Sequence, residues 1–168
     1  MPWSAATVQG WKPCSTLASP GIMSSPSEPA RRCLVNETRL RVRYVETDQM
    51  GVVYHTNFLI WFEVGRVEFL RQLGFTYRDM EREDGCYIAV VDARCRYKAP
   101  ARYDDQILVR TFFKNLRASL IHFGYEILRE PEMTLLAEGE TTHIVTDAGM
   151  QRRELPAKYQ AAFARALG

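Results

Sequence analysis

Apolar and polar residues begin to alternate regularly at Thr38. Over Thr38–Glu46, the side chains of Leu40, Val42 and Tyr44 share one face of an extended chain, and three arginines share the other. This period of two predicts a half-buried strand whose basic face is solvated.

The next segment, Asn57–Leu73, has the period of a helix instead. Asn57 can cap its first turn and Gly74 can end it, which makes a helix of about 25 Å. Its bulky apolar residues fall on or near one side: Phe58, Trp61, Phe62, Phe69 and Leu73. An aromatic stripe of this size needs a sheet to cover it.

Four later runs are typical of long strands, and short turns separate them. The runs are Cys86–Tyr97, Gln106–Phe113, Leu120–Arg129 and Thr134–Thr146. Connections this short imply antiparallel neighbours, and Pro156–Leu167 is predicted to add a short closing helix. One long helix against one curled antiparallel sheet is an α+β architecture.

Parts of these strands are apolar on both faces. Tyr87–Val91 and Ile107–Val109 are the clearest examples. A single helix covers only one face of a sheet, so the other face is predicted to meet a second subunit.

Residues 1–33 differ in composition from the remainder. They hold five of the eight prolines and six serines, with neither helical nor strand period. This composition predicts a disordered leader, either without function or used for docking or targeting. Residues 34–168 are predicted to form a single domain.

The leader also carries the excess positive charge. The chain has 22 Lys and Arg against 20 Asp and Glu, and residues 34–168 hold 19 of each. A nucleic-acid binder needs a basic surplus, so this balance counts against that class. No apolar run reaches the roughly 18–20 residues of a membrane span, and the start lacks the apolar core of a secretory signal, so we expect a cytoplasmic protein.

Several common catalytic motifs are missing from the sequence. It has no GxSxG, no glycine-rich phosphate loop, no HExxH and no CxxC among its four cysteines, which we expect to be reduced. His55, His122 and His143 lack the spacing of metal ligands, so neither a metal nor another cofactor is expected. Within strands, His122 and His143 are expected to be structural.

The loop between the first strand and the helix has the residues for acyl transfer. Asp48 can act as a base on water or as a nucleophile. Gly51 permits a backbone turn that a side chain would block. Residues 54–57 are expected to present free backbone N–H groups at the positive end of the helix dipole, where an oxygen that gains negative charge is stabilised. Alternatively, Asp48 simply forms the turn.

At this point the sequence resembles a known family. The run from Asp48 to Phe58, DQMGVVYHTNF, is followed by Glu63 and Arg66 on the predicted helix and later by the segment YKAPARYDD at 97–105. These motifs are similar to those of hotdog-fold acyl-CoA thioesterases of the 4-hydroxybenzoyl-CoA thioesterase class, especially the YbgC-type branch. The likeness extends from about Arg39 to Asp147.

The resemblance implies a hotdog fold, with one long helix wrapped by a five-stranded antiparallel sheet. It also implies homodimers or homotetramers with active sites at the subunit boundary. The family's catalytic aspartate corresponds to Asp48, and its backbone donor to the thioester carbonyl corresponds to His55, whose side chain is a second catalytic candidate. Tyr54, Asn57 and Gly51 would shape the substrate pocket.

Other positions are more ambiguous. A second hotdog class carries its carboxylate on the helix, which makes Glu63 a candidate site residue, but an ion pair with Arg66 three residues on explains it more simply. The chain departs from the usual motif at Glu46, where an aspartate is expected, and at Met50, where a smaller residue is expected. The larger Met50 is expected to affect which acyl group fits.

A CoA ester also needs cations for its phosphates. Six basic residues near strand ends are candidates, and Lys98 and Arg117 are the preferred pair. The predicted function is hydrolysis of acyl-CoA thioesters. The alternatives are a non-catalytic module that binds acyl-CoA or acyl carrier protein, and a hotdog hydratase, which would need an Asp/His pair directed at the acyl chain.

Overall fold

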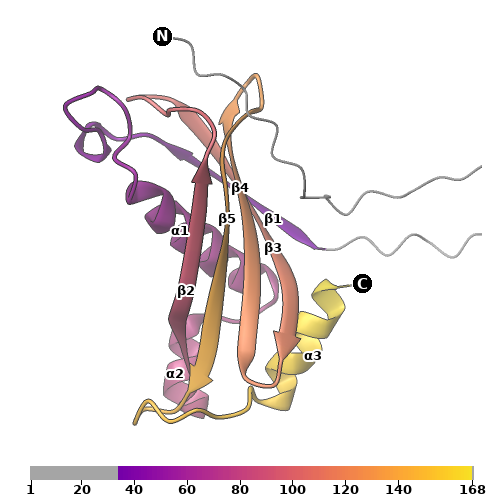
Figure 1. Cartoon of the computed structure of the whole chain (residues 1–168). Coiled ribbons are helices and arrows are strands. Elements are labelled where there is room, and N and C mark those ends of the chain that lie inside the picture. The colour runs from indigo at the N-terminus through magenta and orange to yellow at the C-terminus, as the bar shows by residue number, and fades with distance from the viewer. Residues whose placement is uncertain (1–33, 168) are drawn as a thin grey trace, which may run out of the picture. The chain divides into compact units, whose positions relative to one another are not determined.

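The computed structural model describes residues 34–167, and the predicted leader at 1–33 lies outside this range. The described part contains five strands in one antiparallel sheet of order β1-β3-β4-β5-β2 (Figure 1). The strands are β1 (Val35–Arg41), β2 (Tyr87–Tyr97), β3 (Gln106–Arg117), β4 (Leu120–Glu130) and β5 (Thr134–Thr146). The helices are α1 (Asn57–Gln72), α2 (Tyr77–Asp84) and α3 (Ala157–Ala166), with a short 3-10 turn at Tyr44–Glu46.

The sheet curls around α1, so the predicted α+β hotdog architecture is confirmed. Every neighbouring pair of strands is antiparallel, and two tight hairpins join β3 to β4 and β4 to β5. The strands β1 and β2 form the two edges of the sheet. The predicted strands and the closing helix agree with these elements within a few residues, apart from β1 and the longer β3.

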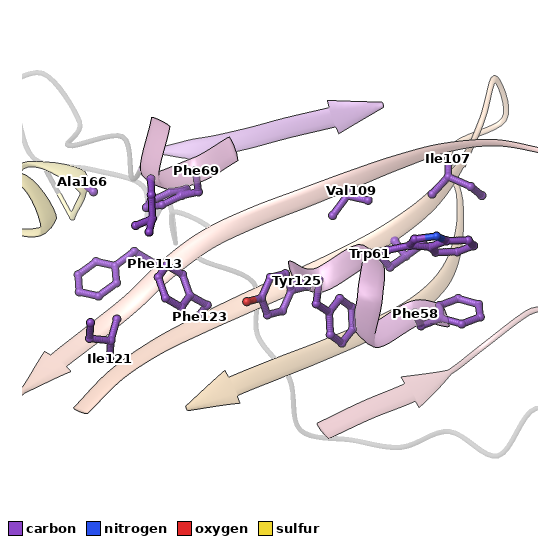
Figure 2. Close-up of a cluster of buried hydrophobic side chains, with 14 of the residues drawn as sticks. Phe58, Trp61, Phe69, Ile107, Val109, Phe113, Ile121, Phe123, Tyr125 and Ala166 are labelled. Atoms are coloured by element: carbon purple, nitrogen blue, oxygen red, sulfur yellow. The ribbon is translucent and has the colours of Figure 1, made fainter. Parts of the chain in front are cut away.

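The aromatic stripe of α1 forms the centre of the core (Figure 2). The ring of Phe62 stacks on Tyr125 of β4, with centroids 4.4 Å apart, and Phe69 meets Phe123 edge-on at 5.8 Å. The predicted residues Phe58, Trp61, Phe62 and Phe69 are all buried, whereas Leu73 lies just beyond the helix and is half-buried. Each buried side chain of this size contributes on the order of 1.5–3 kcal/mol of hydrophobic stabilisation.

A glycine lets α1 approach the sheet closely. A Cβ atom at Gly65 would lie 2.3 Å from Thr111 Oγ1 and 2.7 Å from Val109 Cγ1 on β3. Such contacts are impossible, so only glycine fits at this helix position. The close approach in turn allows the neighbouring rings to reach the middle strands.

The first strand is shorter than predicted. It ends at Arg41, and the Val42 N–H donates to the carbonyl of Asp105, after which the chain turns into the 3-10 segment. Tyr44 was therefore wrongly assigned to the buried face, since it is 79% exposed. The alternating pattern extended past the point at which pairing with β3 stops.

Helix α2 was not predicted from the sequence. Its eight residues are mostly charged, and only Met80 is buried, so no apolar stripe marks it. Local signals do define its ends: the Thr76 hydroxyl accepts the Asp79 N–H, and Gly85 adopts a left-handed conformation with φ 56°.

The outer face of the sheet gives less support than predicted for a second subunit. Ile107, Leu108 and Val109 are all buried within one chain, so β3 needs no second subunit to cover it. Ion pairs between strands occupy this face, for example Arg110–Glu37 at 2.9 Å. By contrast, Val90 on the edge strand β2 remains 54% exposed.

A buried polar network lies between α1 and the sheet. The Thr141 hydroxyl makes hydrogen bonds with Tyr125 at 2.8 Å and with Nε2 of His143 at 2.7 Å. Burial, together with the positive charges of Arg66 and His122, lowers the pKa of His143 to about 3. His143 is therefore a neutral structural residue, as the sequence predicted.

We expect Gly65→Ala to lower the free energy of unfolding by about 1–2 kcal/mol. The steric conflict with Val109 and Thr111 outweighs the roughly 1 kcal/mol by which alanine favours a helix. Urea denaturation measures the change. The same substitution in a background with Val109→Ala and Thr111→Ala is the control, because both obstructing side chains are shortened and the cost should shrink. An equal cost in both backgrounds would contradict this packing.

His143 predicts a dependence of stability on pH. Its pKa is about 6.5 in the unfolded chain and lower when folded, so below about pH 6.5 only the unfolded chain takes up the proton. This residue should therefore lower the free energy of unfolding by up to about 1.4 kcal/mol per pH unit as the pH falls. Denaturation at about pH 7 and pH 5 should show a shallower dependence for His143→Gln. An unchanged dependence would refute the assignment.

Candidate active site

The loop before α1 is a narrow hairpin-like turn. The Asp48 N–H donates to the carbonyl of Val52 at 2.8 Å, and the Gly51 N–H donates to the carbonyl of Asp48 at 2.9 Å. Gly51 has a φ of 71°, a conformation that glycine adopts without strain. The predicted need for glycine at this turn is confirmed.

The Asp48 carboxylate has one oxygen engaged and one available. Its Oδ1 accepts the Met50 N–H at 2.8 Å, so the residue does form a turn, as the alternative interpretation proposed. Within residues 34–167, Oδ2 has no hydrogen-bond partner, and the residue is half-buried. The turn bond fixes the side chain and leaves an oxygen that a water molecule or a substrate can reach.

Backbone bonds hold the two ends of this loop together. The carbonyl of Glu46 accepts both the Tyr54 N–H at 2.9 Å and the Asn57 side-chain amide at 2.8 Å. On the opposite side, the Val53 N–H donates to the carbonyl of Ala101 at 2.8 Å. The loop is thus attached both to the start of α1 and to the segment between β2 and β3.

The start of α1 offers fewer free donors than predicted. The Tyr54 N–H is bonded to Glu46, and the Asn57 N–H is bonded to the carbonyl of Tyr54 at 3.0 Å. Among the described residues, the N–H groups of His55 and Thr56 have no acceptor. Thr56 occupies the capping position without a side-chain bond, so Asn57 does not cap the helix but instead joins it to the loop.

A tyrosine on β2 supports this helix start. The Tyr97 hydroxyl donates to the carbonyl of His55 at 3.0 Å, and the Tyr97 ring meets Phe58 edge-on at 5.2 Å. The His55 ring lies against Tyr54, with centroids 4.3 Å apart. Both rings are exposed at the end of the loop, so they can border a bound substrate.

The helix carboxylate Glu63 does not make the predicted ion pair. Arg66 turns toward α2 instead, where its Nε donates to the Tyr77 hydroxyl at 2.7 Å. Glu63 is exposed on the same side of α1 as the exposed apolar residues Ile60 and Val64. Because the ion pair with Arg66 does not form, Glu63 remains a candidate site residue.

The preferred pair of phosphate ligands is separated in one chain. The Lys98 ammonium lies 2.9 Å from the Glu138 carboxylate, just beyond the end of β2. Arg117 ends β3, whose 12 residues span about 35–40 Å from the end near the Asp48 loop. Arg102 lies closer to the loop, since its guanidinium is 3.4 Å from the carbonyl of Gly51.

Residues 34–167 show neither a cluster of metal ligands nor a membrane-spanning helix. The described residues contain no group of three or more His, Cys, Asp or Glu side chains placed to hold a metal ion. None of the described helices is both long and apolar enough to pass through a bilayer.

The comparison with protein families agrees with the fold and the loop. A family model described as the thioesterase-like superfamily matches residues 42–165, which include the Asp48 loop and all of α1. The chain belongs to the thioesterase-like superfamily. The resemblance seen in the sequence, including its enzymatic class, is confirmed.

Several members of the superfamily are similar in sequence or structure. The Bacillus subtilis protein YneP, provisionally named an acyl-CoA thioesterase, is 40% identical over 113 residues, covering 67% of this chain and 80% of YneP. The acyl-CoA thioester hydrolase YbgC of Escherichia coli O157:H7 is 34% identical, covering 74% and 92%. A DHNA-CoA thioesterase from Staphylococcus aureus superposes with a TM-score of 0.74 at 31% identity, covering 78% of this chain and 89% of that one.

In the present chain, two residues that lie at the Asp48 loop were not identified from the sequence as important. Tyr97 belongs to the quoted segment 97–105 but had no assigned role. Glu46 was noted only as a departure from the motif, yet the residue is 4% exposed and its side chain is hydrogen-bonded to Trp61 at 3.2 Å. A single acidic residue at the end of an alternating strand gives no signal that its side chain points inward.

Proposed function

We propose that this thioesterase hydrolyses acyl-CoA thioesters, with Asp48 as base or nucleophile and the His55 N–H as donor to the thioester carbonyl. One observation carries the proposal. A single short loop, joined at both ends to Glu46, holds a carboxylate with a free oxygen and leads into a helix start where the N–H groups of His55 and Thr56 have no acceptor among residues 34–167. The names of YneP and YbgC, an acyl-CoA thioesterase and an acyl-CoA thioester hydrolase, support the choice of acyl-CoA.

The chemistry follows from these two groups. As a base, Asp48 takes a proton from water while the water oxygen attacks the carbonyl carbon. Negative charge gathers on the carbonyl oxygen, where the His55 N–H and the positive end of α1 stabilise it. The carbon–sulfur bond then breaks, and the CoA thiolate leaves and accepts the proton.

A nucleophilic role uses the same atoms in another order. Asp48 attacks the carbonyl carbon, CoA thiolate leaves, and water hydrolyses the resulting anhydride to the free acid and the original carboxylate. In either route the His55 side chain is a secondary group, and Tyr54, Asn57 and Gly51 shape the space beside it. Lys98 is the proposed phosphate ligand beside the loop, and Arg117, which lies at the far end of β3 in the same chain, would have to come from a second copy. Glu63 is a proposed contact on the α1 side.

We also propose that two copies pair along β2. Its outer edge has no neighbouring strand in the sheet, and Val90 is exposed there. On α1, Ile60 and Val64 are exposed as well. Unpaired strand edges and exposed apolar side chains both favour association, and an isologous contact satisfies both at once.

The decisive prediction concerns Asp48→Asn, which we expect to lower kcat by roughly 10²–10⁴. Asparagine keeps an oxygen for the Met50 N–H, so the turn and the melting temperature should be preserved. His55→Ala is the control: it removes the ring but retains the backbone N–H, so its effect should be much smaller. Steady-state hydrolysis across CoA esters, with circular dichroism melts, measures both. Turnover close to wild type in Asp48→Asn would remove the mechanism.

The pairing along β2 predicts a dimer mass by light scattering at micromolar concentration. Val90→Lys should shift the protein toward the monomer, because it places a charge on the proposed interface. Val35→Lys is the matched control, since Val35 is an exposed valine on the opposite edge strand, β1. A monomeric wild type, or equal effects of the two substitutions, would contradict the proposed interface.

A further inference from the structure

Glu46 has a buried carboxylate with both oxygens in use. Its Oε2 accepts the Arg43 backbone N–H at 2.7 Å. Its Oε1 accepts the indole N–H of Trp61 and a guanidinium N–H of Arg43, both at 3.2 Å. The residue is 4% exposed, so these donors replace most of its contact with water.

The environment keeps this carboxylate charged. Burial opposes ionisation, but the bonds from the Arg43 backbone N–H and the Trp61 indole, together with the Arg43 guanidinium, outweigh it and lower the pKa of Glu46. A charged acceptor makes hydrogen bonds that are stronger than those of a neutral one. The contact between the 3-10 turn and α1 is therefore a hydrogen bond to a charged acceptor.

Glu46 joins three parts of the site at one residue. Its side chain binds Trp61, one turn inside α1. Its backbone carbonyl binds Tyr54 and Asn57, at the far end of the Asp48 loop. Asp48 lies two residues after Glu46, and His55 follows Tyr54, so both proposed reacting groups are fixed to the same point.

We propose that Glu46 is a positioning residue, which sets the distance and orientation between the Asp48 carboxylate and the His55 N–H. This inference rests on the proposed function. Glu46 has no part in the chemistry itself, because its two oxygens are occupied and it is shielded from solvent. It acts by holding the loop against α1, and a displacement of about 1 Å between reacting groups can cost about 100-fold in rate.

The donors around Glu46 require a carboxylate, because three N–H groups share its two oxygens. A glutamine has only one side-chain oxygen. Its NH2 group would face the N–H of either Arg43 or Trp61, which places two donors together without an acceptor. Glu46→Gln therefore does not preserve the whole set of bonds.

The test is the kinetics of Glu46→Gln at a temperature well below its melting temperature. We expect kcat to fall about 10- to 100-fold, while the KM for a CoA ester changes less than about threefold, because binding groups remain but their alignment with the reacting groups is lost. Tyr159→Phe is the matched control: it removes the hydrogen bond to Asp84 on α2 and should lower stability without lowering kcat.

A double-mutant cycle separates positioning from general destabilisation. If Glu46 acts through Asp48, Glu46→Gln should have almost no further effect on kcat in an Asp48→Asn background. The inference is overturned if the two substitutions lower kcat independently, so that their losses multiply. It is also overturned if Glu46→Gln has a normal kcat while Asp48→Asn is inactive, and in that case the proposed function still stands. Normal turnover in Asp48→Asn overturns both. If Glu46→Gln does not fold, Trp61→Phe removes one bond of the set and enters the same cycle.

Discussion

The close contact between α1 and the middle of the sheet is the constraint on which the rest of the structure depends. Gly65 allows the helix backbone to lie against Val109 and Thr111, and this separation lets Phe62 stack on Tyr125. A helix held further out would leave the aromatic stripe partly hydrated, at a cost proportional to the apolar area exposed. The core therefore fixes the axis of α1 before any polar contact is considered.

The site takes its geometry from that fixed helix. The first turn of α1 supplies the helix N-terminus, and Trp61 supplies a hydrogen bond to the buried carboxylate of Glu46. The other end of the loop is held at the same residue, because Tyr54 and Asn57 both donate to the carbonyl of Glu46. Functional side chains on a short loop thus acquire the rigidity of the scaffold without lying on a regular element.

Much of the architecture could be predicted from the sequence because burial has a period. Phe58, Trp61 and Phe69 repeat with the spacing of a helix face, and each is buried in the structure. Helix α2 escaped detection because its stability depends on end caps and one buried residue, Met80, which leave almost no pattern.

The polar contacts of the site were predicted less well, because they depend on direction in space. Residue spacing suggested an ion pair between Glu63 and Arg66, but the structure directs Arg66 toward Tyr77, on a helix that was not foreseen. The loop residues Asp48 and Gly51 were singled out by the resemblance of their segment to a thioesterase motif. The positive φ of Gly51 agrees with the predicted turn, whereas the catalytic role of Asp48 stays a prediction. The inward direction of Glu46 is a property of the folded chain, which no local pattern expresses.

The ion pairs on the outer face of the sheet have a consequence for higher assembly. Arg110 lies between Glu37 and Glu126 across three neighbouring strands, and Lys114 pairs with Glu140. A second sheet stacked on this face would meet a surface whose charges already satisfy one another, so it would have little apolar area to bury. Any such back-to-back contact would be wet and polar, and it would weaken as ionic strength rises.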